Sequence, residues 1–347
     1  MRTALTNKRH LWKPASAGNF LRSLKIAHKN EFLERAKSLP RRCALILLTG
    51  LALISAKALP ASQREGDKAT APANQLEIFA SILPQVEFIE AVGGERVHAQ
   101  ALLQPGQNPH AYEPSPKQLI ALSKASAFFR VGVPFEDALV PRLQSTMKDL
   151  KIVDTHRGVR LRRMSTEEGY REHKHHELGN DANDPHIWLS PLLIIQQAIN
   201  IRDALIQLDP ENEKLYQTRC QAFRERLEKL HEELKNTLAP FAGREILVYH
   251  PSFGYFADAY GLRQVAVETG GKEPTPKALA SFISLAKERK ISIVFVQPQF
   301  SQASARAIAG QIGGTTIELN PLDKNCLENL ANLGEKIAGT LLNEPAE

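Results

Sequence analysis

The chain has 347 residues, 43% apolar and 24% charged, which is a globular composition with room for one large domain or two ordinary ones. Its formal net charge of +6 is not evenly spread, because residues 1–58 hold 12 of the 44 lysines and arginines and only two acidic residues. The rest of the chain carries 32 basic and 36 acidic side chains, a formal charge of −4. The composition therefore gives no reason to expect a nucleic-acid partner.

The first 58 residues predict an export signal behind a long basic leader. Basic residues up to Arg42 precede an apolar run at 44–56, and Ala56-Lys57-Ala58 fits a small-x-small cleavage site. The run is shorter than the ~20 residues that a membrane-spanning helix needs. We therefore expect a cleaved signal peptide and a periplasmic protein, with an uncleaved anchor as the alternative. Residues 59–74 are small and polar and predict a flexible start of the mature chain.

Short apolar runs then alternate with helical patterns. The first series predicts strands at 76–80, 97–103 and 127–131, with helices at 82–92 and 116–125. A second series predicts strands at 245–249, 264–267, 291–296 and 315–319, with helices at 275–289 and 301–312. Alternation of this kind is typical of parallel sheets covered by helices. We expect an α/β fold with two β/α lobes, residues 75–208 and 241–347.

One long helical segment, residues 209–240, separates the two series. Asp209-Pro210 predicts a helix start and Pro240 its end. Apolar residues between them recur every three or four positions: Tyr216, Cys220, Phe223, Leu227, Leu230, Leu234 and Leu238. We expect one rigid linker helix that joins the lobes, although an ordinary packed helix or a coiled-coil partner would give the same stripe.

Three histidines occur in similar settings far apart in the sequence. His110 follows Asn-Pro, His186 follows Asp-Pro, and His250 precedes Pro-Ser-Phe. Proline holds the preceding residue in an extended or turn conformation, which predicts that these histidines lie on loops near strand ends. Three imidazoles that converge from such loops would bind a borderline-soft divalent cation, above all zinc. We therefore expect a metal site of these three residues in the cleft between the lobes.

Neighbouring residues predict supporting roles. Glu113 and Glu268 are candidate acceptors for an imidazole N–H, which would fix the tautomer that binds metal; surface carboxylates are the alternative. The aromatic residues Tyr112, Trp188 and Phe253 are candidates for the walls of the site, and ordinary core packing is the alternative for each.

Two further features leave alternatives open. The segment 165–183 is polar and contains His173, His175 and His176, which suits either weak metal capture or a solvated charged loop. Cys220 and Cys326 would remain after cleavage of the signal, and their spacing allows either a disulfide or two thiols.

These motifs, in this order, resemble the zinc- and manganese-binding substrate-binding proteins of ABC importers (cluster A-I). The resemblance covers residues 75–343 and rests on Pro-Gly-x-x-Pro-His-x-Tyr-Glu-Pro at 105–114, Asp-Pro-His-x-Trp-Leu-Ser-Pro at 184–191 and His-x-x-Phe-x-Tyr-Phe at 250–256. It implies two α/β lobes joined by a rigid helix, no enzymatic activity, and transfer of the ion to a membrane permease by a monomer.

The same resemblance implies the ligand set and the metal. His110, His186 and His250 match the first three ligand positions of the family. Members selective for manganese have a carboxylate at the third position, so His250 indicates zinc as the transported ion. A histidine-rich loop before the second motif is also typical of the zinc branch.

The chain departs from the family at a fourth position. Many members have an aspartate ligand in Leu-Asp-Pro-Leu, whereas this chain has Leu319-Asn320-Pro321-Leu322. A neutral amide is a poor zinc ligand, so either water or a nearby carboxylate such as Asp323 would complete the site. On this basis an Asn320→Asp variant is expected to bind zinc more tightly.

A secreted zinc hydrolase is the competing hypothesis, since three histidines and one open position also describe a catalytic zinc. The sequence contains no His-Glu-x-x-His segment, and Glu113 is the nearest candidate for a general base. An importer component is therefore the preferred interpretation.

Overall fold

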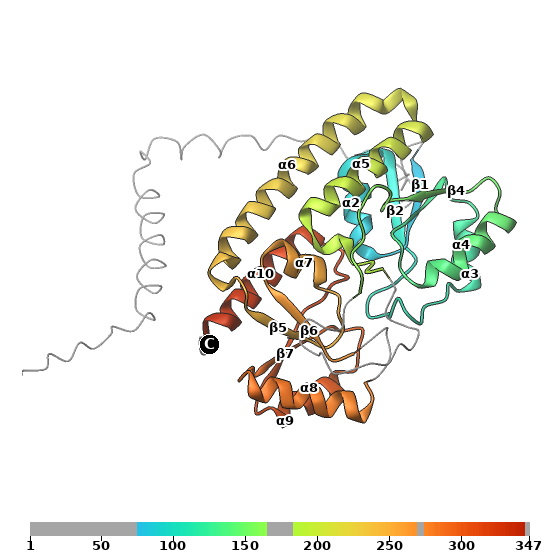
Figure 1. The fold of residues 1–347 in the computed structure, drawn as a ribbon. Coiled ribbons are helices and arrows are strands. Elements are labelled where there is room, and N and C mark those ends of the chain that lie inside the picture. Colours follow the sequence, from blue (N-terminus) through green and yellow to red (C-terminus); the bar gives the residue numbers. More distant parts are fainter. Residues whose placement is uncertain (1–74, 165–182, 269–273, 344–347) are drawn as a thin grey trace, which may run out of the picture. The chain divides into compact units, whose positions relative to one another are not determined.

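The computed structural model describes residues 75–164, 183–268 and 274–343, which all belong to one compact unit, residues 68–347 (Figure 1). The predicted export signal, the segment 59–74 and the three histidines of the segment 165–183 fall outside the described residues. Among the described helices, none is both long and apolar enough to cross a membrane.

The first lobe is a parallel sheet with helices. Its strands are β1 (Leu76–Ala80), β2 (Val97–Ala101), β3 (Ala127–Arg130) and β4 (Lys151–Asp154), in the order β2-β1-β3-β4. Its helices are α2 (Leu83–Gly93), α3 (Pro116–Leu122) and α4 (Phe135–Thr146). All pairings in this sheet are parallel. The carboxyl ends of its strands therefore meet at one edge, where ligands bind in open sheets of this type.

The second lobe repeats this arrangement. Its strands are β5 (Glu245–Val248), β6 (Arg263–Ala266), β7 (Ile293–Val296) and β8 (Thr315–Glu318), in the order β6-β5-β7-β8, again all parallel. Its helices are α7 (Gly254–Ala259), α8 (Pro276–Glu288), α9 (Gln302–Gln311) and α10 (Cys326–Asn343).

The inner strands β5 and β7 of the second sheet are buried on both faces, which explains their apolar runs. Successive residues of β5 point to opposite faces. Ile246 and Val248 join the large hydrophobic core that extends into the first lobe. Leu247 and Val294 of β7 join a separate core that includes residues of α8 and α9.

Two helices lie between the two sheets in the sequence, α5 (Pro191–Leu208) and α6 (Glu213–Leu238). All seven apolar residues of the predicted stripe are buried along α6. The helix packs against α2 and α5 and also against α10, so it contacts helices from both parts of the chain. At Gly334 of α10 an added Cβ would lie 2.4 Å from Leu234 Cδ2, so a larger residue there would require the Leu234 side chain to shift.

The start of α6 differs from the prediction. The α-helix begins at Glu213, after a 3-10 turn at Pro210–Asn212. Asp209 does not cap a backbone N–H of this turn; its carboxylate accepts hydrogen bonds from Arg96, Asn212 and the Tyr216 hydroxyl. Pro210 lies within this turn, where the chain changes direction before the long helix. The hydrogen bond from Arg96 to the Asp209 carboxylate attaches the turn to the first lobe.

The predicted strands and helices of both series are confirmed, with ends that differ by a few residues. The patterns did not predict β4, α4, α5, α7 or α10.

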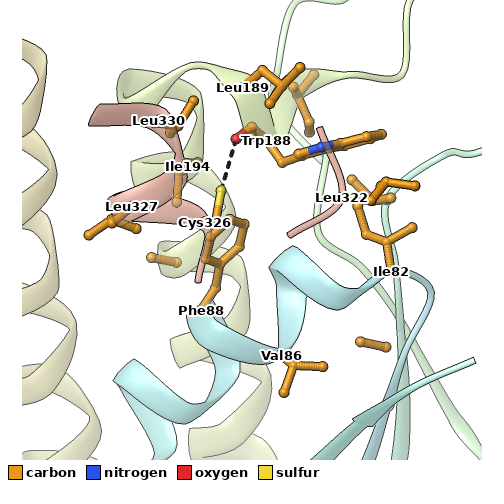
Figure 2. Close-up of a cluster of buried hydrophobic side chains, with 14 of the residues drawn as sticks. Ile82, Val86, Phe88, Trp188, Leu189, Ile194, Leu322, Cys326, Leu327 and Leu330 are labelled. Atoms are coloured by element: carbon orange, nitrogen blue, oxygen red, sulfur yellow. Dashed lines mark hydrogen bonds between the residues drawn. The ribbon is translucent and has the colours of Figure 1, made fainter. Parts of the chain in front are cut away.

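A hydrophobic cluster lies where the first lobe meets the start of α10 (Figure 2). It brings Phe88 of α2 and Ile194 of α5 together with Leu327 and Leu330 of α10. The Cys326 thiol donates to the Trp188 carbonyl within this cluster, with an Sγ···O distance of 3.5 Å.

Cys220 and Cys326 are free and buried, so the disulfide left open by the sequence is not formed. Their thiols donate to different carbonyls, those of Ala198 and Trp188. Burial raises the pKa of both thiols, most strongly at Cys326. We expect the protein that begins at residue 59 to react with Ellman's reagent at neither thiol when native and at two thiols per chain in denaturant. One rapidly reacting thiol in the native protein would contradict this burial.

Candidate metal centre

The three predicted histidines lie at the ends of strands or on the segment that faces them. His110 lies on the loop after β2, and His250 follows β5 by two residues. His186 precedes a 3-10 turn at Ile187–Leu189 that leads into α5. The structure thus brings together residues from both lobes, as expected for ligands at the carboxyl ends of parallel strands.

The Asn-Pro-His and Asp-Pro-His segments form the same local turn. The Asn108 side-chain oxygen accepts the His110 backbone N–H at 2.9 Å, and Asp184 Oδ1 accepts the His186 backbone N–H at 3.0 Å. In each case an Asn or Asp side chain binds the backbone two residues on, while the intervening proline restricts the chain. The two motifs therefore fix the backbone of each histidine independently of any ligand.

The backbone of His250 is held by a different device. The Gln297 side chain accepts the His250 N–H and donates to the His250 carbonyl, with N···O distances of 3.2 and 2.6 Å. The Phe300 ring stacks on the imidazole, with centroids 4.4 Å apart and an interplanar angle of 19°. Neither Gln297 nor Phe300 was predicted from the sequence.

The imidazoles converge on one another. The Nε2 atoms of His110 and His250 are 3.4 Å apart, and the centroids of the His186 and His250 rings are 5.3 Å apart. Two nitrogens that bind one tetrahedral zinc at ~2.0–2.1 Å lie about 3.4 Å from each other. In the described residues no three His, Cys, Asp or Glu side chains already surround a single point as ligands. The ring contacts therefore show that the three imidazoles are close together, and some adjustment of the side chains would complete the site on binding.

Buried carboxylates orient two of the three rings. Asp184 Oδ1 lies 2.7 Å from Nδ1 of His186, and Glu268 Oε2 contacts Nδ1 of His250. A proton held on Nδ1 by a carboxylate leaves the lone pair of Nε2 available for a metal. The prediction for Glu268 as such an acceptor is confirmed.

The prediction for Glu113 is wrong. Its side chain is exposed, and among the described residues none of the three imidazoles is hydrogen-bonded to it. Asp184 performs the expected role instead. Its signal was present in the sequence, because the aspartate of Asp-Pro-His can reach both the backbone and the ring of a histidine two residues on.

A Glu268→Gln variant tests this orientation. The amide oxygen can still accept from Nδ1, but the negative charge that strengthens the imidazole as a ligand is lost. We expect zinc affinity to fall by about 10-fold or more. Isothermal titration with a zinc-buffering competitor measures the change, and Glu113→Gln is the matched control. Equal effects of the two substitutions would contradict the assigned role.

A small pocket opens between the lobes beside these rings. Its walls combine His186 and His250 with residues that follow β7 and β8; the full lining is Pro109, His186, Trp188, His250, Ser252, Gln299, Phe300, Pro321 and Leu322. The volume of this pocket that the centre of a water molecule could occupy is about 10 Å³. This is close to the minimum for one water molecule, so the pocket suits a single ion better than an organic substrate.

Of the predicted wall residues, only Trp188 lines this pocket. Its ring centroid lies 5.1 Å from that of His186. Tyr112 instead packs on Phe135 and donates to the Leu102 carbonyl, and Phe253 is fully buried in the core. For these two residues ordinary packing is the correct interpretation.

Burial keeps the rings of His110 and His250 neutral. Burial, with His250 and His186 nearby, lowers the pKa of His110 to about 3. Burial also lowers the pKa of His250, against the opposing effect of Glu268. Neutral imidazole is the form that binds a metal ion, so these two histidines already have the required protonation state near pH 7.

Neither Asn320 nor Asp323 lines the pocket. Asn320 Oδ1 accepts hydrogen bonds from Gln299 Nε2 at 3.0 Å and from the Leu322 N–H at 3.1 Å. Asp323 Oδ1 accepts the N–H of Asn325. Oδ1 of each side chain is thus directed at protein donors, and Asp323, the carboxylate that the sequence suggested as a fourth ligand, is not part of the pocket lining.

Comparison with known proteins places this geometry in a family. Residues 78–333 match the family model described as the periplasmic component A of the zinc-uptake complex (ZnuA). The chain belongs to this family. The match includes the three histidines, the paired sheets and α6.

Two curated relatives illustrate the range of the family. The chain is 32% identical over 254 residues to the zinc-binding lipoprotein AdcA of Streptococcus pneumoniae (strain ATCC BAA-255 / R6), which covers 72% of this chain and 50% of that protein. It is 28% identical to the high-affinity zinc uptake system protein ZnuA of Bacillus subtilis (strain 168), covering 72% of this chain and 79% of that protein. The chain thus spans about half the length of the AdcA lipoproteins it matches.

Solved structures agree in fold. A crystal structure of ZnuA superposes with a TM-score of 0.70 at 37% identity, covering 77% of this chain and 99% of that one. A zinc-bound ZnuA with residues 138–173 of its own chain deleted gives the same TM-score at 36% identity, covering 79% and 100%. The two-lobed α/β architecture predicted from the sequence is confirmed.

Proposed function

We propose that this protein captures one zinc ion with His110, His186 and His250 and delivers it to the permease of an ABC importer. The observation that supports this most directly is the 3.4 Å separation of the His110 and His250 Nε2 atoms, which join the two lobes at ligand spacing. The names of the relatives, zinc-binding lipoprotein and zinc uptake protein, agree with zinc as the transported ion.

Zinc is favoured over manganese by the donor set. Imidazole nitrogens suit zinc, whereas manganese prefers carboxylate, carbonyl and water oxygens. The two buried carboxylates next to the site, Asp184 and Glu268, bind the outer nitrogens of imidazoles. They therefore add negative charge without replacing a nitrogen ligand.

The hydrolase alternative finds no support in the site. No residue that lines the pocket carries a carboxylate that could act as a general base. Glu113, the candidate from the sequence, is exposed and outside the lining. The family to which the chain belongs is a component of an uptake complex, so we assign no enzymatic activity.

We further propose that residues 1–58 direct export, that cleavage follows Ala58, and that the mature protein acts as a monomer in the periplasm with residues 209–240 as its linker. The family description as periplasmic agrees with the first part. Mass spectrometry of protein recovered from the periplasm gives the cleavage site, and light scattering on a sizing column gives the monomer mass.

The test is a metal titration of the protein that begins at residue 59. We expect one tightly bound zinc per chain that a 100-fold excess of manganese does not displace. Zinc-free protein that takes up no tight equivalent, or that exchanges zinc readily for manganese, would contradict the proposal.

A further inference from the structure

One buried side-chain oxygen at the pocket has no hydrogen-bond partner among the described residues. Oε1 of Gln299 is buried and accepts no hydrogen bond from any described residue. Gln299 follows β7 and lines the pocket together with His186 and His250. A buried acceptor without a donor is unfavourable in a folded protein. Such an atom beside converging ligands indicates a partner that arrives with the ligand.

The hydrogen bonds of Asn320 determine which way the Gln299 amide points. The Leu322 backbone N–H can only donate, so the Asn320 side-chain atom that it contacts at 3.1 Å must be the oxygen. The Gln299 atom that contacts the same oxygen at 3.0 Å must then be the NH₂ group. Oε1 is therefore turned away from Asn320. The assignment rests on a backbone donor and not on the similar shapes of oxygen and nitrogen.

Resting on the proposed zinc function, we propose that Gln299 presents the oxygen that faces the fourth coordination position of the ion. The three imidazoles occupy the other positions. A tetrahedral zinc with three histidines has one open position, and a carbonyl-type oxygen is an acceptable but weak donor there. In this chain Asn320 acts through Gln299: it does not reach the ion but holds the glutamine amide in the orientation that exposes Oε1.

The proposal predicts different effects on zinc affinity when the amide of Gln299 and the amide of Asn320 are replaced by carboxylates. A carboxylate at 299 would place its charge at the open position, whereas a carboxylate at 320 would keep one oxygen on the Leu322 N–H and on Gln299 Nε2. The sequence alone favoured the opposite, a gain in affinity at 320. Positions 299 and 320 both have an amide side chain, and either can be changed to the matching carboxylate. The structure therefore predicts different effects for two substitutions that change the charge equally.

The experiment is a competition titration with zinc and with manganese on the whole protein from residue 59. The variants are Gln299→Leu, Gln299→Glu and Asn320→Asp, with Gln311→Leu and Gln311→Glu on the exposed end of α9 as controls. We expect zinc affinity to fall about 10-fold in Gln299→Leu. We expect it to rise at least about 10-fold in Gln299→Glu, together with a measurable gain for manganese, and to rise less in Asn320→Asp.

Opposite signs for leucine and glutamate at one position distinguish a metal-facing oxygen from a purely structural role, in which both substitutions weaken binding. The proposal is overturned if Gln299→Leu and Gln299→Glu change affinity in the same direction, if neither changes it, or if Asn320→Asp gains as much as Gln299→Glu. In each of these outcomes the proposed function still stands if the wild-type protein binds one zinc ion and the His110→Ala variant does not. If wild-type protein binds no zinc, or if His110→Ala binds it as tightly as wild type, the proposed function itself fails.

Discussion

Replacement of His110 by alanine is expected to weaken zinc binding by more than about 100-fold, because substitutions that only orient a ligand already cost 10- to 100-fold. His110 is the best of the three histidines for this test. It is partly exposed, and its ring contacts another imidazole and not a buried carboxylate. Removing His186 or His250 would instead take from the buried Asp184 or Glu268 the imidazole partner that it has in the fold, which is destabilising in itself.

The measurement is a competition titration with a fluorescent zinc chelator, alongside thermal unfolding with and without zinc. Wild-type protein should gain stability when zinc is added, since a ligand that binds only the folded state stabilises it. His110→Ala should unfold at nearly the wild-type temperature without zinc and gain little with it. His98→Ala is the control, because that ring is exposed and pairs with Glu77. An unchanged zinc affinity in His110→Ala would show that the three motifs do not form one site.

The sequence predicted the convergence of the histidines but not the atoms that orient them. Proline next to a histidine is a local signal, and it correctly predicted that His110 and His186 lie outside helices and strands. The partner of an imidazole N–H is decided by tertiary packing. Glu268 follows β6, the neighbour of β5, and so reaches His250, whereas Glu113 lies on the exposed part of its loop.

The same distinction explains which elements were missed. The inner strands β5 and β7 of the second lobe are apolar runs and were predicted, while β4 has an exposed lysine and ends in an aspartate that pairs with Arg130. Helix α4 contains Pro141 within its span, which weakens any pattern for a helix. Gln299 gave no signal at all, because a lone glutamine after a strand acquires meaning only from its contact with Asn320.

Replacement of Trp188 by alanine is expected to cost about 4–6 kcal/mol of stability. The side chain is 1% exposed, and truncation of a buried aromatic costs about 3–5 kcal/mol. The indole Nε1–H donates to the Pro321 carbonyl at 2.7 Å, so its loss also leaves that carbonyl without this donor, which adds about 1 kcal/mol or more. A typical domain has only ~5–15 kcal/mol in total. The variant should therefore be close to unfolding at 37 °C.

Trp188→Phe separates the two parts of this effect. Phenylalanine retains most of the ring in the cluster of Figure 2, beside Leu322, but cannot donate to Pro321. We expect a loss of about 1–2 kcal/mol in urea denaturation, against less than ~0.5 kcal/mol for the control Leu342→Ala, whose side chain is 73% exposed. A loss in Trp188→Ala no larger than in Trp188→Phe would contradict the packing argument.

The Trp188→Phe variant also tests whether the hydrogen bond between Trp188 and Pro321 affects zinc binding. Trp188 lies two residues after His186, and Pro321 lies between Asn320 and Leu322 on the loop after β8. The bond therefore ties the segment that carries one histidine of the first lobe to the loop that orients Gln299 in the second. If this tie sets the distance between the histidines, Trp188→Phe should lower zinc affinity at a temperature where the variant is fully folded. An affinity equal to wild type there would assign Trp188 to stability alone.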